Sequence, residues 1–366
     1  MKLPAFEDLS KEQDLIYNLD LDGNYLVSGP PGTGKSVMAL YRAQILAIDD
    51  RDPAVLMYSN VLKQYTKQAA NEVDVAMLVN TYNKWFWKFW RTHYRQPPPT
   101  VPGNPYEVEW PKAAERFMNE PPPLKSLADL IVDEGQDLAL GFFRLAKFIA
   151  KNMTVFADEN QQLFENNTTL DEIAKGIGAL QHLELRRNYR NTAEISAVAA
   201  TYYAGAPTGR PDPPERRGDK PTIRRYDDID GFVDFVARYV KTKSNLTIGV
   251  ACPTAGIRNT LFNKLGARKL PIAVQKYDSA NQAHKVLDFD SPAVTIVHYK
   301  SLKGLEFDTL FVPELQRAAG DATSAAMRML FYVVMSRARD ELYLSWSESS
   351  VMPPILGGLK GLVQEQ

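Results

Sequence analysis

Residues 25–40, YLVSGPPGTGKSVMAL, constrain the fold more than any other part of the chain. Their centre, residues 29–36, has the spacing G-x-x-x-x-G-K-S of a phosphate-binding loop between a β-strand and an α-helix. The apolar residues 25–27 predict the strand, and a helical pattern follows. Glycines let backbone N–H groups turn toward a phosphate, and the next helix adds its positive end. This stretch therefore predicts a parallel α/β fold that holds a phosphate at a helix N-terminus.

The loop predicts ATP and Mg²⁺ as cofactors and assigns their contacts. Lys35 is expected to bridge the β- and γ-phosphates, and the Ser36 hydroxyl is expected to bind Mg²⁺. The other loop residues expected at the nucleotide are Gly29, Gly32, Thr33 and Gly34.

Two adjacent carboxylates, Asp133 and Glu134, follow the apolar residues 130–132. A strand that ends here would place both at the carboxyl edge of a parallel sheet, where ligands of open α/β sheets bind. Asp133 would hold Mg²⁺ through water, and Glu134 would orient and deprotonate the attacking water. A solvated acidic turn is the alternative for this stretch alone. Together with the loop, the stretch predicts a nucleotide hydrolase.

Short apolar runs alternate with helical patterns in both halves of the chain, which predicts two α/β domains with parallel sheets. The expected strands are 25–27, 54–58, 130–132, 154–156, 183–185, 247–251, 294–297, 309–312 and 342–345. The strongest expected helices are 37–46, 142–149, 192–203 and 325–336. No internal repeat is evident.

Two proline-rich stretches interrupt this alternation. Residues 97–123 hold nine prolines and predict an irregular insertion, which with the aromatic residues before it spans 83–123. Residues 207–221 hold five prolines and are expected to connect the domains. The expected organisation is an N-terminal domain, a C-terminal domain and a Gly-rich, weakly specified tail, at residues 1–190, 191–352 and 353–366.

The composition excludes several classes of protein. The sequence contains no run of 18 apolar residues, so no membrane span is expected. Its first residues lack the apolar core of an export signal, so export is not expected. A single cysteine, Cys252, permits neither an internal disulfide nor a cysteine zinc cluster, which fits the cytoplasm. The formal net charge is −1, so any contact with nucleic acid is expected in a local groove.

Further motifs follow in series along the chain. They read VFADENQQLF at 155–164, LRRNYRNTAE at 185–194, VHYKSLKGLEFDTLFVP at 297–313 and FYVVMSRARDELYL at 331–344. With the loop and the acidic strand end, their order and spacing resemble the UvrD/Rep family of superfamily I helicases, from Gln13 to about residue 344. The resemblance implies two RecA-like domains with ATP in the cleft between them. It also implies an ATP-dependent DNA helicase or translocase that moves 3′ to 5′ on single-stranded DNA.

The resemblance assigns contacts with the adenosine. Gln13 matches the glutamine that reads the adenine edge, Tyr189 matches the tyrosine that stacks on adenine, and Glu306 matches the glutamate at the ribose. These three residues are expected to bind ATP from outside the loop.

The resemblance also assigns three residues to the γ-phosphate. Gln161 matches the glutamine that senses it, and Arg190 and Arg337 match two arginines that reach it. Arginine suits phosphoryl transfer because it delivers positive charge bidentately to phosphate oxygens. Since Arg337 belongs to the second domain, its charge would arrive only when the domains close on ATP.

The residues that match the single-strand track of the family are Ser59, Asn60, Thr81, Tyr82, His298 and Lys300. Lys300 stands where the family commonly has histidine, a change that preserves a phosphate contact. Phe164 is the candidate for the aromatic residue that stacks on a base after Gln161, although no tryptophan follows it. Single-stranded DNA or a single-strand/double-strand junction is the expected substrate.

The segment NKWFWKFWRTHYRQ, at 83–96, is a further candidate for contact with a single strand. In a helix, Trp85, Phe86, Phe89, Trp90 and His93 would share one face, and Lys84, Lys88, Arg91 and Arg95 would form a stripe on another. Aromatic rings beside cations suit single-strand binding. Burial in the core is the favoured interpretation for the rings, and the role of the basic stripe is left open.

Three other functions remain as alternatives. The insertions are short compared with full helicases of the family, which would suit a nucleotide-gated, nucleic-acid-binding ATPase subunit of a repair or phage-defence complex. A nuclease or another protein would then be its partner, and the subunit alone would not unwind robustly. An RNA helicase of the same superfamily is a further alternative. A small-molecule kinase would share the loop and the acidic strand end, but it would not require arginines from a second domain.

Overall fold

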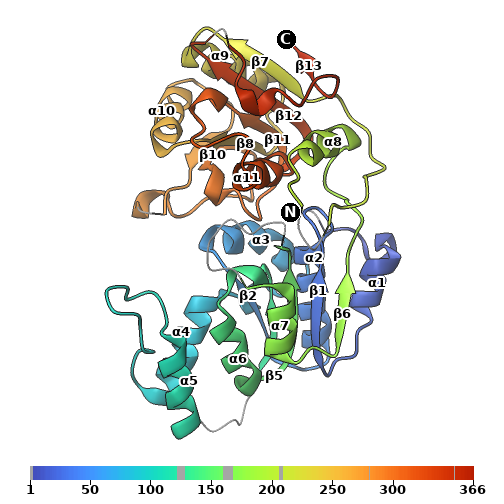
Figure 1. The fold of residues 1–366 in the computed structure, drawn as a ribbon, viewed down its shortest axis with the longest axis vertical. Coiled ribbons are helices and arrows are strands. Elements are labelled where there is room, and N and C mark those ends of the chain that lie inside the picture. The colour runs from blue at the N-terminus through green and yellow to red at the C-terminus, as the bar shows by residue number, and fades with distance from the viewer. Residues whose placement is uncertain (1–2, 122–127, 160–167, 206–208, 280, 350) are drawn as a thin grey trace. The chain divides into compact units, whose positions relative to one another are not determined.

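The computed structural model describes the chain at 3–121, 128–159, 168–205, 209–279, 281–349 and 351–366 (Figure 1). Gln161 and Phe164 lie outside the described residues, so their roles stay predictions. The chain divides into two compact units. The first comprises Met1–Gly29 and Gly34–Leu185, and the second comprises Pro30–Thr33 and Arg186–Gln366.

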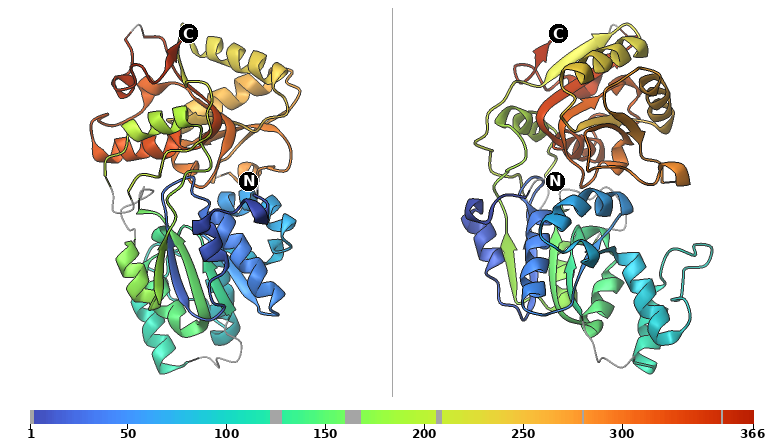
Figure 2. Two further views of the ribbon diagram at one scale, coloured as in Figure 1. Left: turned by 90° about the vertical axis from the view of Figure 1, so that its right-hand side faces the viewer. Right: turned by 180° about the vertical axis from the view of Figure 1, so that it is seen from behind.

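The first unit is built on a parallel sheet with the strand order β3-β2-β4-β5-β1-β6. The strands are β1 (Asn24–Ser28), β2 (Pro53–Met57), β3 (Val79–Thr81), β4 (Ala128–Val132), β5 (Ala150–Ala157) and β6 (Gln181–Glu184). The helices are α1 (Lys11–Tyr17), α2 (Lys35–Ile48), α3 (Asn60–Glu72), α4 (Tyr82–Tyr94), α5 (Trp110–Asn119), α6 (Leu140–Ile149) and α7 (Leu170–Ile177). Parallel neighbours require crossover connections, and these helices provide them on both faces of the sheet (Figure 2).

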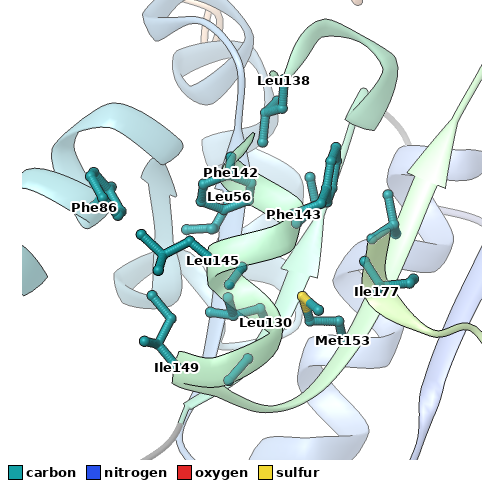
Figure 3. Packing of buried hydrophobic residues seen from close by; sticks show 14 of the residues in the cluster. Leu56, Phe86, Leu130, Leu138, Phe142, Phe143, Leu145, Ile149, Met153 and Ile177 are labelled. Atoms are coloured by element: carbon teal, nitrogen blue, oxygen red, sulfur yellow. The ribbon is translucent and has the colours of Figure 1, made fainter. Parts of the chain in front are cut away.

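Aromatic and aliphatic side chains fill the space between this sheet and helices α4 to α7 (Figure 3). Phe142 and Phe143 of α6 are fully buried there, next to Leu130 of β4. Phe86 and Trp90 of α4 are also fully buried, which confirms the expected burial of the aromatic face. His93 was assigned to the same face but is exposed.

The second unit has a parallel sheet with the strand order β13-β7-β12-β11-β8-β10-β9. The strands are β7 (Thr222–Tyr226), β8 (Ile248–Cys252), β9 (Ala273–Lys276), β10 (Ala293–His298), β11 (Phe307–Val312), β12 (Ala338–Ser347) and β13 (Gln364–Glu365). The helices are α8 (Ala193–Thr201), α9 (Ile229–Thr242), α10 (Ala255–Gly266) and α11 (Ala325–Met335). No helix among the described residues of either unit has the length and apolar character to cross a membrane.

Each expected strand overlaps an observed one, but two expected irregular segments are partly ordered. Helix α5 lies inside the proline-rich insertion and begins with Trp110 and Pro111, where proline is tolerated. After Met352, Ile355 and Leu356 are buried and β13 pairs with β7. The last residues therefore belong to the second sheet, and the expectation of a weakly specified tail was wrong.

The two sheets repeat the same topology, which sequence inspection did not reveal. When the second sheet is taken from its other end, β10-β8-β11-β12-β7-β13 corresponds strand for strand to β3-β2-β4-β5-β1-β6, and β9 is added at the edge. In this correspondence β11 takes the place of β4, and β7 takes the place of β1.

The turns after β4 and β11 also match. Each strand leads into a glutamate in the left-handed region, Glu134 with φ 56° and Glu314 with φ 57°, followed by a short 3-10 turn. Gln136 donates its side-chain amide to Glu134 at 2.5 Å, and Gln316 donates to Glu314 at 3.0 Å. Left-handed backbone is uncommon outside glycine. We call this shared structure the Glu-x-Gln turn.

Candidate nucleotide-binding and catalytic site

The loop between β1 and α2 has glycine where its backbone requires it. Gly32 and Gly34 have φ of 89° and 91°, in the region that favours glycine. A Cβ at Gly34 would lie 2.6 Å from Nε2 of Gln13, and one at Gly32 would clash with the side chain of Asn188. Helix α2 begins at Lys35, directly after the second glycine. The first N–H groups of a helix have no acceptor within the helix itself, which makes this end suitable for an anion.

Lys35 is held at the base of the loop inside the first unit. Its ammonium donates to the backbone carbonyl of Gly29 at 2.6 Å and lies 3.5 Å from Oδ2 of Asp158. Lys35 is 7% exposed and Asp158 is fully buried. Asp158 directly follows β5, the strand beside β1, and sequence analysis did not assign it a role. The sequence feature that could have pointed to Asp158 is its position at the end of a predicted strand.

Ser36 and Asp133 meet at the carboxyl edge of the first sheet. The Ser36 hydroxyl donates to Oδ2 of Asp133 at 2.6 Å, and the backbone N–H of Glu134 donates to Oδ1 at 3.0 Å. Burial, helped by the negative charge of Glu134, raises the pKa of Asp133 to about 7, against the opposing effects of Ser36 and Lys35. The two residues expected to bind Mg²⁺ are thus adjacent.

The oxygen atoms of Ser36 and Asp133 fit Mg²⁺, which prefers hard oxygen ligands and keeps several waters or phosphate oxygens. A fully buried carboxylate that resists ionisation is also a group that a cation would stabilise. Within the described part of the chain, no group of three or more His, Cys, Asp or Glu side chains could hold a metal.

Glu134 is oriented by a neighbour that sequence analysis did not single out. Gln136 is fully buried, donates its amide to Glu134, and accepts at 2.9 Å from the backbone N–H of Asp158. One side chain therefore links the expected catalytic base to the residue beside Lys35. The pairing joins positions 22 residues apart, so no local pattern could have revealed it.

In the second unit, Arg190 and Glu306 are paired with each other. Nε of Arg190 lies 2.7 Å from Oε2 of Glu306, and Nη1 is 3.5 Å from the carbonyl of Ser336. Burial alone would raise the pKa of Glu306, but the charges of Arg190 and Arg339 outweigh it and lower the pKa to about 2. The glutamate is therefore ionised at neutral pH.

Arg337 lies between α11 and β12, with an exposure of 1%. Its Nε donates to the carbonyl of Val333 at 3.0 Å. Arginine is seldom buried this completely. Tyr189 is different, because its ring is 40% exposed, with the guanidinium of Arg187 5.4 Å from the ring centroid. The backbone N–H of Tyr189 donates to Gly32 at 2.8 Å.

Two hydroxyls expected on the single-strand track are helix caps. The Ser59 hydroxyl accepts from the N–H of Leu62 at the start of α3, where Asn60 is the first residue. The Thr81 hydroxyl accepts from the N–H of Lys84 at the start of α4. Both helices follow neighbouring strands, β2 and β3, so their N-termini lie at the same sheet edge.

Tyr82, also expected on this track, stacks on Tyr58 with ring centroids 6.2 Å apart and an interplanar angle of 8°. Tyr58 is 36% exposed at the end of β2 and was not assigned by sequence analysis. The sequence feature that could have pointed to Tyr58 is an aromatic residue directly before Ser59. An exposed ring at this edge could stack on a base.

In the second unit, His298 ends β10 and holds the next turn. Its Nδ1 accepts from the N–H of Lys300 at 3.2 Å, and Nε2 lies 3.1 Å from the carbonyl of Pro253. Burial lowers the pKa of His298, with smaller contributions from nearby cations. The Lys300 side chain is exposed. The histidine is therefore a neutral structural link beside an exposed cation.

Residues 16–166 match the family model described as an AAA domain. Over 253 residues the chain is 25% identical to a protein of Acanthamoeba polyphaga mimivirus named as an ATP-dependent DNA helicase. That match covers 64% of this chain and 36% of the relative, so the chain spans about a third of the relative's length. The residues that the family model matches include the phosphate-binding loop, Asp133 and Glu134.

The likeness to one solved structure establishes the fold. The chain resembles S. cerevisiae Dbp5 bound to RNA and ADP BeF3, with a TM-score of 0.53 and 13% identity over 99% of this chain and 90% of Dbp5. The two units are therefore RecA-like α/β domains, as expected. The C-terminal domain of a possible DNA helicase from Lactobacillus plantarum matches with a TM-score of 0.38 and 24% identity, over 48% of this chain and 98% of that domain.

Proposed function

We propose that this chain is an ATP-dependent DNA helicase or translocase of the UvrD/Rep type. Single-stranded DNA stimulates its ATP hydrolysis, and it moves 3′ to 5′. The observation that carries the proposal is the cluster at one sheet edge, where Ser36 lies 2.6 Å from Asp133 beside the buried Lys35 and Glu134. The mimivirus relative supports DNA as the substrate.

Each residue of the cluster has a defined task in hydrolysis. Lys35 and the first turn of α2 hold the phosphates. Ser36 and Asp133 hold Mg²⁺, which when bound neutralises phosphate charge. Glu134, oriented by Gln136, accepts the proton of the attacking water. A cation beside Asp133 would lower its raised pKa and favour the ionised carboxylate.

The remaining ATP contacts follow from the motif assignments. Gln13, Tyr189 and Glu306 bind the adenosine, while Gln161, Arg190 and Arg337 respond to the γ-phosphate. An arginine that reaches the γ-phosphate from the second domain ties domain closure to ATP binding and opening to hydrolysis. In the Arg190–Glu306 pair each charge compensates the other until a nucleotide competes for them.

The single strand contacts the N-termini of α3 and α4, because their backbone N–H groups and positive dipole ends attract phosphates. Tyr58 and Tyr82 provide a stacked pair of rings for a base. Lys300 supplies a further phosphate contact. The single cysteine, Cys252, is buried and reduced, which suits a cytoplasmic enzyme.

The decisive experiment measures ATP hydrolysis without polymer, with single-stranded DNA, and with single-stranded RNA of equal length. We expect DNA to raise turnover at least tenfold and the Lys35→Ala variant to remain inactive in every condition. Strand displacement from duplexes with 3′ or 5′ tails then tests direction. A lack of stimulation by either polymer would refute the proposal. Slow turnover without displacement, together with a co-purifying partner, would instead indicate a nucleotide-gated subunit.

A further inference from the structure

Helices α3 and α4 carry a charged surface that the proposed ATP site does not use. Its cations, which we call the α3–α4 basic surface, are Lys63, Lys67, Lys84, Lys88, Arg91 and Arg95. Lys63 is half-buried and the others are exposed. Helix α4 contains no acidic residue, and the only acidic residue of α3 is Glu72 at its last position. The positive charge of this face is therefore not neutralised from its own helices.

Carboxylates of other described elements form no ion pair with this surface. Among the residues that the structure describes, none of these six cations forms an ion pair, whereas Lys112, Lys175 and Lys264 on other helices each pair with a carboxylate. The pKa of Lys63 is lowered by its partial burial and by the positive charges of Lys84 and Lys67. These charges therefore repel one another in a chain whose formal net charge is only −1. An anionic partner would relieve that repulsion.

The cations on α4 are arranged as a line. Lys84, Lys88 and Arg91 follow the spacing i, i+4, i+7, which places them along one side of the helix, and Arg95 is the C-cap residue that follows its last turn. At 1.5 Å per residue the line from Lys84 to Arg91 is roughly 10 Å long, enough to face about two or three phosphates of one DNA strand. It starts at the sheet edge of the proposed single-strand track and leads away from that edge along α4 (Figure 1).

Apart from His93, which is exposed, the rings of α4 are buried or half-buried. Phe86 and Trp90 are fully buried, and Trp85 and Phe89 pack against the core. The guanidinium of Arg91 lies 5.3 Å from the ring centroid of Trp87. Single strands are held by base stacking as well as charge, whereas duplexes can be held through the backbone alone. A line of cations whose neighbouring Phe and Trp rings are buried or half-buried favours a duplex.

We propose that the α3–α4 basic surface binds the sugar–phosphate backbone of the duplex arm at a single-strand/double-strand junction. The single strand then leaves the duplex at the N-termini of α3 and α4 and enters the proposed track. This inference rests on the proposed function, because it assigns a place to the duplex that such an enzyme would open.

The test compares the binding of the full chain to a short single strand, to the same strand joined to a duplex arm, and to a blunt duplex, at several salt concentrations. The test variant is Lys88→Gln/Arg91→Gln/Arg95→Gln. The control variant is Lys112→Gln/Arg116→Gln/Lys175→Gln, which removes the same charge from other helices of the first unit. A third variant, Lys88→Arg/Arg91→Lys/Arg95→Lys, keeps the charge of the line.

We expect the wild-type chain to bind the junction at least tenfold more tightly than the single strand. The test variant should lose most of that preference, and the slope of log affinity against log salt should fall by about two to three on the junction. The control variant should keep the junction preference within about twofold, and so should the charge-preserving variant. Melting temperatures check that all variants are folded.

Two results would overturn the inference while leaving the proposed function intact. One is a wild-type chain that is stimulated by single strands but shows no junction preference. The other is a test variant that loses affinity equally for single strand and junction, which would assign the line to the single-strand track. If no nucleic acid binds or stimulates the wild-type chain, the proposed function itself fails.

Discussion

Nε of Arg190 lies 2.7 Å from Oε2 of Glu306, which places two expected ATP contacts against each other inside the second unit. Both side chains are largely shielded from water, with exposures of 16% and 13%. A pair of this kind depends on both partners, because removing one leaves a shielded charge without compensation. The pair can therefore be tested separately from the chemistry expected of each residue.

The first test is the variant Glu306→Gln. We expect the free energy of unfolding of the second unit to fall by about 2–3 kcal/mol, less than for a fully buried pair because some water reaches both groups. Urea unfolding of the wild type, both single variants and Arg190→Gln/Glu306→Gln measures the coupling. If the two single effects simply add, the pair does not stabilise the unit.

The second prediction concerns pH. The folded pKa of Glu306, about 2, lies below its ordinary value of 4.5, so its stabilising contribution is fully present above about pH 4.5. That contribution is lost as pH falls through the range toward 2, and it amounts to something on the order of 3 kcal/mol. Unfolding measured between pH 6 and pH 3 should show a weaker pH dependence for Glu306→Gln than for the wild type. Identical curves would contradict the assignment.

The third prediction concerns Gly34 and has a matched control. Gly34→Ala introduces a Cβ both at φ 91° and 2.6 Å from Gln13, so we expect ATP affinity to fall more than tenfold. Gly103→Ala places a Cβ at φ 82° with nothing within 4 Å, so it should cost about 1 kcal/mol and leave ATP binding unchanged. Titration with a fluorescent ATP analogue compares the two. Equal affinities would show that the loop tolerates the side chain.

The fourth prediction concerns Gln136, a positioning residue. Gln136→Ala removes the hydrogen bond to Glu134, so we expect kcat for ATP hydrolysis to fall about 10–100-fold while KM changes less than about threefold. Gln316→Ala removes the equivalent bond to Glu314 and should leave kcat unchanged. Steady-state kinetics of both variants make the comparison. A parallel loss in both would indicate a general effect on stability.

Sequence patterns predicted those elements whose signal is local. Strands β1 and β4 are buried on both faces, so their apolar runs are plain in the sequence. Strand β7 was missed because TIRRY carries two arginines, and β13 was missed because its two residues are exposed. Both strands depend on pairing with residues far along the chain, which periodicity does not report.

In the candidate site too, the residues with a local sequence signal could be predicted and those defined by distant contacts could not. Lys35, Ser36, Asp133 and Glu134 could be predicted because each belongs to a motif with its own spacing. Asp158 and Gln136 could not, because their roles arise from contacts between three separate strand ends. The basic stripe of α4 was visible in the sequence, but only the structure shows that the helix turns its rings inward and leaves the cations unpaired among the described residues.

The repeated topology raises the question of how many nucleotides each chain binds. The Glu-x-Gln turn after β11 repeats the turn that orients Glu134 in the first unit. The helix that corresponds to α2 is α9. Helix α9 is capped by the carboxylate of Asp228, at the position where the first unit has its glycine loop and Lys35. An acidic side chain at the N-terminus of α9 repels a triphosphate. Each chain should therefore hold a single nucleotide, and a titration of binding should end at one equivalent.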